Sequence, residues 1–187
     1  PILQREGEQA VEKSMIGQAA AELVNDGETV FLGSGTTVLE TAKNLRERKN
    51  LTVITNSLPV LNALAGIKEI TVVSLGGQLR ESELSFIGHI TEQALAEVRV
   101  DKVVMGARGL SLEHGLTNDY LQETLTDRAI LKIGHEVILV ADHSKVNRVS
   151  TALLAPLSSM NTFVTDSKAD KKFIQTLKKQ NIKVVIA

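Results

Sequence analysis

Short, continuously apolar segments rich in β-branched residues recur along the 187-residue chain. Strands are expected at residues 29–32, 51–55, 70–75, 102–105, 136–141, 162–165 and 183–186. Such segments are typical of strands that are covered on both faces of a parallel sheet. Between them, apolar residues recur at helical spacing, first at Val11, Met15, Ala19 and Leu23. This alternation predicts a single α/β domain with an open, mainly parallel sheet and helices on both faces.

Two stretches of the chain, residues 77–88 and 146–160, follow neither the strand period nor the helix period. They fit a loop, a lid or a small antiparallel subdomain, and the sequence leaves these alternatives open. The remaining segments with helical spacing are those around Val38, Ala42 and Leu45 and at residues 89–98, 120–133 and 171–181.

Composition and charge exclude several classes of site. Cysteine is absent, which excludes disulfides, thiolate metal sites and cysteine nucleophiles. The aromatic content of 3% argues against a base-stacking platform, and the net charge of −1 gives no basic surface that would hold DNA unaided. The sequence shows no apolar run of membrane-spanning length, no signal-peptide pattern and no HExxH spacing among its four histidines. We therefore expect a cytoplasmic protein without a membrane, metal or cofactor partner.

Glycine and polar residues directly follow six of the expected strands. These segments are residues 33–37, 56–57, 76–80, 106–109, 142–145 and 166–168. Because the carboxyl ends of parallel strands share one edge of a sheet, ligands bind in the crevice there. Hydroxyl, amide and charged side chains at this edge indicate a polar, anionic ligand. The alternative interpretation of each segment is that such residues only form turns and helix caps.

The segment Gly33-Ser34-Gly35-Thr36-Thr37 carries the most specific signal. Glycines let the backbone approach a ligand closely, and the helix start that follows directs free N–H groups and partial positive charge at it. The chemistry suits a phosphate group. The segment lacks the Lys of a Walker loop, the third Gly of a dinucleotide-binding turn and the first Gly of a nucleophile elbow.

The order and spacing of short motifs resemble those of the C-terminal effector-binding domain of DeoR-family bacterial transcription regulators. The resemblance runs from about Lys13 to Asp166. It rests on Lys13, Ile16, Ala19-Ala20, Asp26-Gly27, Gly35-Thr36-Thr37, Thr55-Asn56-Ser57, Gly76-Gly77, Ser85-Phe86-Ile87-Gly88, Asp101-Lys102, Gly106, Gly109, Gly115-Leu116-Thr117, Glu123, Arg128-Ala129, Ala141-Asp142, Ser144-Lys145 and Thr165-Asp166.

The resemblance implies a fold similar to ribose-5-phosphate isomerases and coenzyme A transferases. It also implies a non-enzymatic sensor of a phosphorylated sugar or related metabolite, in a homo-oligomeric repressor of sugar metabolism genes. Family members carry an N-terminal winged helix-turn-helix, and we expect no such part in the residues before Glu8. We therefore expect residues 1–187 to form one effector-binding domain, with residues 1–12 as the linker from that missing part. Operator DNA would be bound only through the missing part.

The hypothesis of a sensor assigns a role to each candidate residue. The phosphate would lie on Ser34, Gly35, Thr36 and Thr37. The sugar would be lined by Thr55, Asn56, Ser57 and the backbone of Gly76 and Gly77, and Gly106 is a further effector-binding candidate. Cations would come from Arg80, Arg108 and Lys145, and sugar hydroxyls would donate to Asp119, Glu123 and Asp142. No catalytic residue is expected.

Two positions depart from the family pattern. Arg108 is a large cation where the family more often has a small residue, and Val146 replaces a usual aromatic residue. Arg108 fits either a second anionic group on the ligand or a structural salt bridge.

The alternative function is an enzyme of the same fold, a sugar-phosphate isomerase or an acyl or coenzyme A transferase. That chemistry needs a carboxylate base near the substrate carbon. Sugar-phosphate isomerases resemble one another in an acidic cluster after the fourth strand, where this chain has Gly106-Ala107-Arg108-Gly109. Glu81 and Glu83 lie in a loop, where acidic residues are commonly solvated. A third interpretation, a structural oligomerisation domain, does not explain the polar strand ends.

Overall fold

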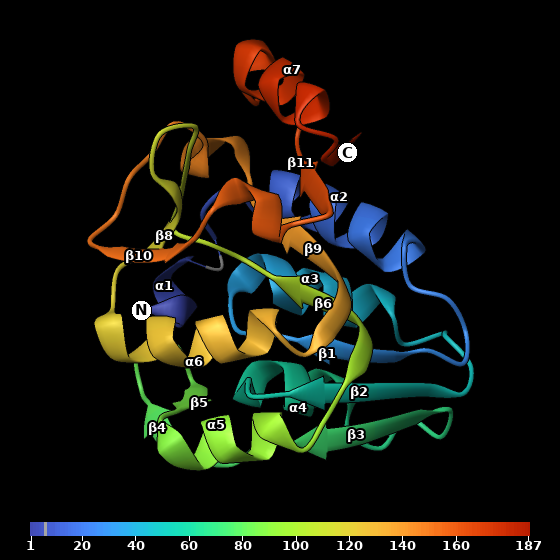
Figure 1. Cartoon of the computed structure of the whole chain (residues 1–187). Coiled ribbons are helices and arrows are strands. Elements are labelled where there is room, and N and C mark those ends of the chain that lie inside the picture. Colours follow the sequence, from blue (N-terminus) through green and yellow to red (C-terminus); the bar gives the residue numbers. More distant parts are fainter. Residues whose placement is uncertain (6) are drawn as a thin grey trace.

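The computed structural model describes residues 1–5 and 7–187. The domain is built around a seven-stranded sheet, and Figure 1 shows the arrangement of its elements. All neighbouring strands in this sheet pair in parallel. In spatial order the strands are β12 (Lys183–Ile186), β11 (Thr162–Thr165), β9 (Gly134–Val140), β6 (Val100–Met105), β1 (Thr29–Leu32), β2 (Leu51–Thr55) and β3 (Ile70–Ser74). The expected open, mainly parallel sheet is confirmed.

Helices cover both faces of the sheet, as expected from the apolar strands. The helices on one face are α2 (Ala10–Glu22), α3 (Thr36–Asn44) and α4 (Leu58–Leu64), and those on the other are α5 (His89–Ala96), α6 (Leu121–Leu131) and α7 (Lys171–Lys179). Alternate residues of β1 serve the two cores, because Val30 and Leu32 pack with the first group and Phe31 packs with the second. None of the described helices is long and apolar enough to cross a bilayer.

The two stretches without a clear period contain short antiparallel strands. In the first, β4 (Gln78–Arg80) pairs with β5 (Ser85–Ile87). The second contains β10 (Ala152–Ala155), which joins β7 (Gly109–Ser111) and β8 (Gly115–Asn118) in a three-stranded sheet. The sequence left open a loop, a lid or a small antiparallel subdomain for these stretches. Both contain antiparallel strands, as the third alternative expects.

The order of the strands positions a crevice between β1 and β6. From β1 the chain adds β2 and β3 on one side, and it then returns to β6 and adds β9, β11 and β12 on the other side. The connections that leave β1 and β6 therefore run in opposite directions. In open α/β sheets this reversal leaves a crevice at the carboxyl ends of the two strands.

The first residues of the chain pack against the domain. The short helix α1 (Ile2–Arg5) buries Ile2, whose backbone N–H donates to the carbonyl oxygen of Ser82 at 2.7 Å. Residues 10–12 of the expected linker form the first turn of α2, whereas Glu6 lies outside the described residues. The role of residues 1–12 as a linker stays a prediction.

Candidate functional site

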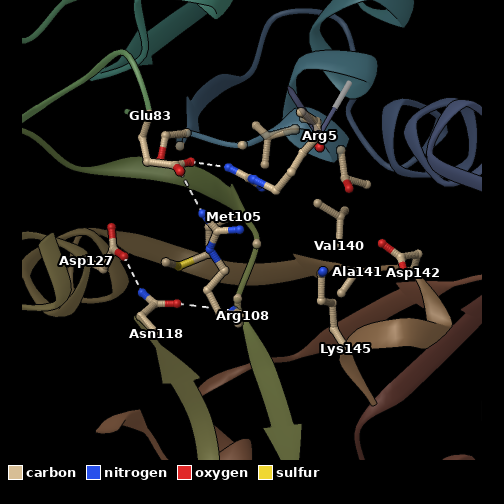
Figure 2. Close-up of a pocket in the computed structure, with 18 of the residues that line it drawn as sticks. Arg5, Glu83, Met105, Arg108, Asn118, Asp127, Val140, Ala141, Asp142 and Lys145 are labelled. Atoms are coloured by element: carbon tan, nitrogen blue, oxygen red, sulfur yellow. Dashed lines mark hydrogen bonds and ion pairs between the residues drawn. The ribbon is translucent and has the colours of Figure 1, made fainter. Parts of the chain in front are cut away.

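A cavity lies in this crevice, at the carboxyl ends of β1, β6 and β9 (Figure 2). Its floor comes from the three segments that directly follow those strands, residues 33–38, 106–108 and 141–142. Side chains from α1, α2, α6, the loop before β5 and the turn after β9 complete its walls. The topology of the sheet thus brings together residues that are far apart in the sequence.

The amino end of α3 faces the cavity without a side-chain cap. Its N-cap residue, Gly35, has φ 120° and ψ 154°, a conformation that is essentially restricted to glycine. The first intrahelical bond runs from the Leu39 N–H to the Gly35 carbonyl oxygen at 2.9 Å, so the preceding N–H groups have no partner within the helix. Thr36 and Thr37 are buried beside them. This arrangement of free donors at a helix start suits an anion.

Four cationic side chains line the same cavity: Arg5, Lys13, Arg108 and Lys145. Lys13 is only 4% exposed, and its Nζ donates to the Arg5 carbonyl oxygen at 2.7 Å. Burial lowers the pKa of both Lys13 and Lys145, and the negative charge of Asp142 opposes this change. An anion bound beside either ammonium group would stabilise the charged form of that group and so oppose the lowering of its pKa.

Arg108 reaches into the cavity and also forms ion pairs. Its Nη2 lies 2.6 Å from Glu83 Oε1, and its Nε lies 3.1 Å from Asp119 Oδ2. Both alternatives from the sequence therefore keep support, because the side chain takes part in structural salt bridges and still lines the cavity.

Carboxyl groups form the opposite wall of the cavity, and each is engaged by neighbours. Glu83 pairs with both Arg5 and Arg108, while Asp127 Oδ2 accepts from Asn118 Nδ2 at 2.6 Å (Figure 2). Burial raises the pKa of Asp127 well above its usual range, and the charge of Glu123 raises it further.

Glu123 is the third carboxyl group of this wall. It pairs with Arg80, and its Oε1 accepts from Ser85 Oγ at 3.0 Å. Burial raises the pKa of Glu123 as well, although the charge of Arg80 opposes that change. In both groups burial disfavours the charged carboxylate, and the hydrogen-bond and ion-pair partners of the two groups oppose that effect.

The cavity collects most of the residues that were assigned to the phosphate and its counter-charges. The candidates that line it are Ser34, Gly35, Thr36, Thr37, Gly106, Arg108, Glu123, Asp142 and Lys145. Seven candidates do not line it: Thr55, Asn56, Ser57, Gly76, Gly77, Arg80 and Asp119.

The candidates that follow β2 have structural partners instead. Thr55 Oγ1 donates to the Leu32 carbonyl oxygen at 2.6 Å, and Asn56 Nδ2 donates to the Phe86 carbonyl oxygen at 3.0 Å. Ser57 is the N-cap of α4. These bonds tie the end of β2 to its neighbours, which accords with the alternative that such residues form turns and caps.

Gly76 and Gly77 follow the edge strand β3, whereas Arg80 and Asp119 contact residues that line the cavity. The Gly76 carbonyl oxygen accepts from Thr91 Oγ1 at 2.8 Å, and a Cβ on Gly77 would lie 2.1 Å from that Oγ1. Arg80 pairs with Glu123, and Asp119 pairs with Arg108. Arg80 and Asp119 therefore hold side chains that do line the cavity.

Five charged or polar lining residues were absent from the candidates: Arg5, Lys13, Glu83, Asn118 and Asp127. Lys13 and Asp127 occur within helical patterns, and Arg5 lies in the expected linker. Glu83 was treated as solvated, yet it is only 4% exposed. The unusual Arg108 was one available signal, since a partly buried guanidinium requires a carboxylate partner.

The solved structures that resemble this chain show the same sheet architecture. Ribose 5-phosphate isomerase A from Neisseria gonorrhoeae aligns with 72% of this chain and 52% of its own, at a TM-score of 0.53 and 20% identity. The delta subunit of eIF2B from Chaetomium thermophilum aligns with 86% of this chain and 57% of its own, at a TM-score of 0.55 and 17% identity. At these identities the likeness shows the fold alone.

Sequence relatives extend the comparison to function. Transcriptional repressor AccR of Agrobacterium fabrum is 35% identical over 94% of this chain and 69% of its own length. HTH-type transcriptional regulator IolR of Bacillus subtilis is 32% identical over 94% of this chain and 70% of its own length. The Glycerol-3-phosphate regulon repressor of Escherichia coli is 30% identical over 98% of this chain and 73% of its own length.

The family assignment follows from the sequence model of the DeoR C terminal sensor domain, which matches residues 8–167. This match covers most of the chain and includes every segment that lines the cavity except the one carrying Arg5. The resemblance noted in the sequence is confirmed. The chain belongs to the DeoR family of transcriptional regulators, of which it contains the sensor domain.

Proposed function

We propose that the chain senses a small phosphorylated sugar or related phosphorylated metabolite, and that it binds this effector in the cavity between β1 and β6. The uncapped start of α3 carries the proposal, because it lines the same cavity as four cationic side chains. A phosphate placed there would receive backbone N–H bonds and the attraction of those cations. One relative is named for the regulon of a phosphorylated compound, glycerol 3-phosphate, which is consistent with this class of effector.

Occupancy of the cavity would then shift an equilibrium between conformers of a repressor. The coupling free energy between two such sites is typically about 1–3 kcal/mol. In this proposal DNA is contacted by the N-terminal winged helix-turn-helix of the family, in a homo-oligomer in the cytoplasm. The relatives support the coarser statement that the chain belongs to a transcriptional regulator.

Binding is favoured over catalysis because every carboxyl group on the far wall already has partners. Glu83 is shared by two guanidinium groups, Glu123 accepts from Arg80 and Ser85, and Asp127 accepts from Asn118. A general base must instead be within hydrogen-bond reach of a substrate proton. The isomerase fold of the structural neighbours does not supply that base, since fold alone does not determine function.

A thermal-shift panel of matched pairs tests the proposed function. The pairs are glycerol 3-phosphate with glycerol and glucose 6-phosphate with glucose, with other sugar phosphates and their parent sugars added. A ligand at one hundred times its dissociation constant stabilises the folded state by about 2.7 kcal/mol. For a chain of this length that corresponds to a rise of about 5–10 °C in the melting temperature. We expect this rise only with a phosphorylated member. Equal shifts from both members of a pair, or no shift from any phosphorylated compound, would contradict the proposal.

A further inference from the structure

The N-terminal segment Ile2–Arg5 contributes a wall to the cavity. Ile2 is 1% exposed, and its backbone N–H is bonded to the Ser82 carbonyl oxygen, so the segment is anchored at its start. At its end, the Arg5 carbonyl oxygen accepts from the buried Lys13 Nζ at 2.7 Å. These two anchors direct the side chain of Arg5 into the cavity (Figure 2).

The guanidinium group of Arg5 is incompletely satisfied. Its Nη2 pairs with Glu83 Oε2, but Glu83 also pairs with Arg108, so two cations share one carboxylate. The Arg5 Nε is buried and has no hydrogen-bond partner among the described residues. A buried, unpaired donor on a charged group is costly, and a second anion in the cavity would satisfy it.

We propose that Arg5 is an effector-binding residue, and that the occupied cavity thereby holds the segment Ile2–Arg5 against the domain. The inference rests on the proposed function, because it needs an anionic effector in this cavity. Arg5 lies before the first residue that the family model matches, residue 8, so the match itself assigns it no role. By reciprocity, an effector that Arg5 binds stabilises the docked segment as much as the docked segment strengthens binding.

In the opposite arrangement, Arg5 occupies the position of the effector and must move out of the cavity before the effector binds. The Arg5 Nε, which has no partner within residues 1–5 and 7–187, argues against this, because a group that only filled the cavity would gain more from complete pairing. The two arrangements predict opposite effects when Arg5 is shortened: weaker effector binding if it is a ligand, and tighter binding if it is a competitor.

Titration calorimetry on the whole chain, with inorganic phosphate and glycerol 3-phosphate as probes, decides between them. We expect Arg5→Ala to weaken binding about 10- to 100-fold, the usual range for losing a hydrogen bond to a charged group. Arg46→Ala, which removes an exposed guanidinium, is the matched control and should bind like the wild type. Arg5→Ala should fold, because Glu83 keeps Arg108 as a partner, and denaturant melts check this.

A second variant and a second measurement separate contact from simple packing. Ile2→Asp should undock the segment while keeping Arg5, and it should weaken phosphate binding as well. In the wild type, saturating phosphate should slow amide hydrogen exchange in Ile2–Arg5, and in Arg5→Ala it should not. Unchanged or tighter binding by Arg5→Ala, beside a wild type that binds, would overturn the inference and leave the proposed function standing. A wild type that binds neither these probes nor any phosphorylated compound of the thermal-shift panel would overturn both.

Discussion

Lys145→Ala is expected to weaken binding of the phosphorylated effector by about 1.5–3 kcal/mol, the value of a hydrogen bond to a charged group. Lys145 follows β9 and the polar turn at residues 142–144, and it lines the cavity. Within the described part of the chain its Nζ has no carboxylate within 4 Å. Asp142 Oδ1 instead accepts from the Ser144 backbone N–H at 2.9 Å. The free energy of unfolding should therefore stay close to that of the wild type.

Calorimetric titration beside denaturant melts measures both quantities for Lys145→Ala. Lys68→Ala, which removes an exposed ammonium group remote from the cavity residues, controls for the loss of one positive charge. A variant that loses stability while keeping its affinity would show that Lys145 is structural. The assignment of Asp142 to effector binding would then be the next one to test.

Asp127→Asn is expected to change how the free energy of unfolding depends on pH. Burial raises the pKa of Asp127 in the folded chain, followed in size by the effect of the Glu123 charge. As pH rises above about 4, the unfolded chain loses this proton first, so the wild type loses stability until the pH passes the folded pKa. Each unit of difference between the folded and unfolded pKa corresponds to about 1.4 kcal/mol. The variant lacks this loss, and its new amide still offers an oxygen to Asn118 Nδ2.

Urea melts from pH 4 to pH 8 measure the effect as the difference between the two stability curves. The variant should gain on the wild type as pH rises across this range. Glu22→Gln removes an exposed carboxylate and controls for the change in net charge. Parallel curves for wild type and Asp127→Asn would show that the Asp127 carboxyl group ionises in the folded chain as readily as in the unfolded one.

The parallel sheet was predictable because its strands carry a strong local signal. All seven expected strands lie in the main sheet. The five inner strands are largely buried, whereas the edge strands β3 and β12 share the β-branched signal but keep exposed residues. The helix α4 was not expected, because it has only seven residues and begins at Leu58-Pro59 directly after the polar end of β2. The strands β4 and β5 have three residues each, too few to show a period.

The site was predictable only where function follows from a local motif. The segment 33–37 signals an anion site through its own glycines and hydroxyls, and it does line the cavity. Strand order decides the rest: β6 and β9 lie on one side of β1, whereas β2 lies on the other side with its polar end bonded to Leu32 and Phe86. Glu83 is buried by Arg5 and Arg108, a long-range pairing that local sequence does not reveal.

Backbone amide NMR on the wild-type chain shows directly whether an anionic group binds at the start of α3. Inorganic phosphate, and then the phosphorylated compound that raises the melting temperature, are titrated against the corresponding unphosphorylated compound. We expect saturable shifts of the Gly35, Thr36 and Thr37 amide resonances with the phosphorylated probes and much smaller shifts with the unphosphorylated compound. Saturation by a phosphorylated compound that leaves these three amides unmoved would contradict binding at the start of α3.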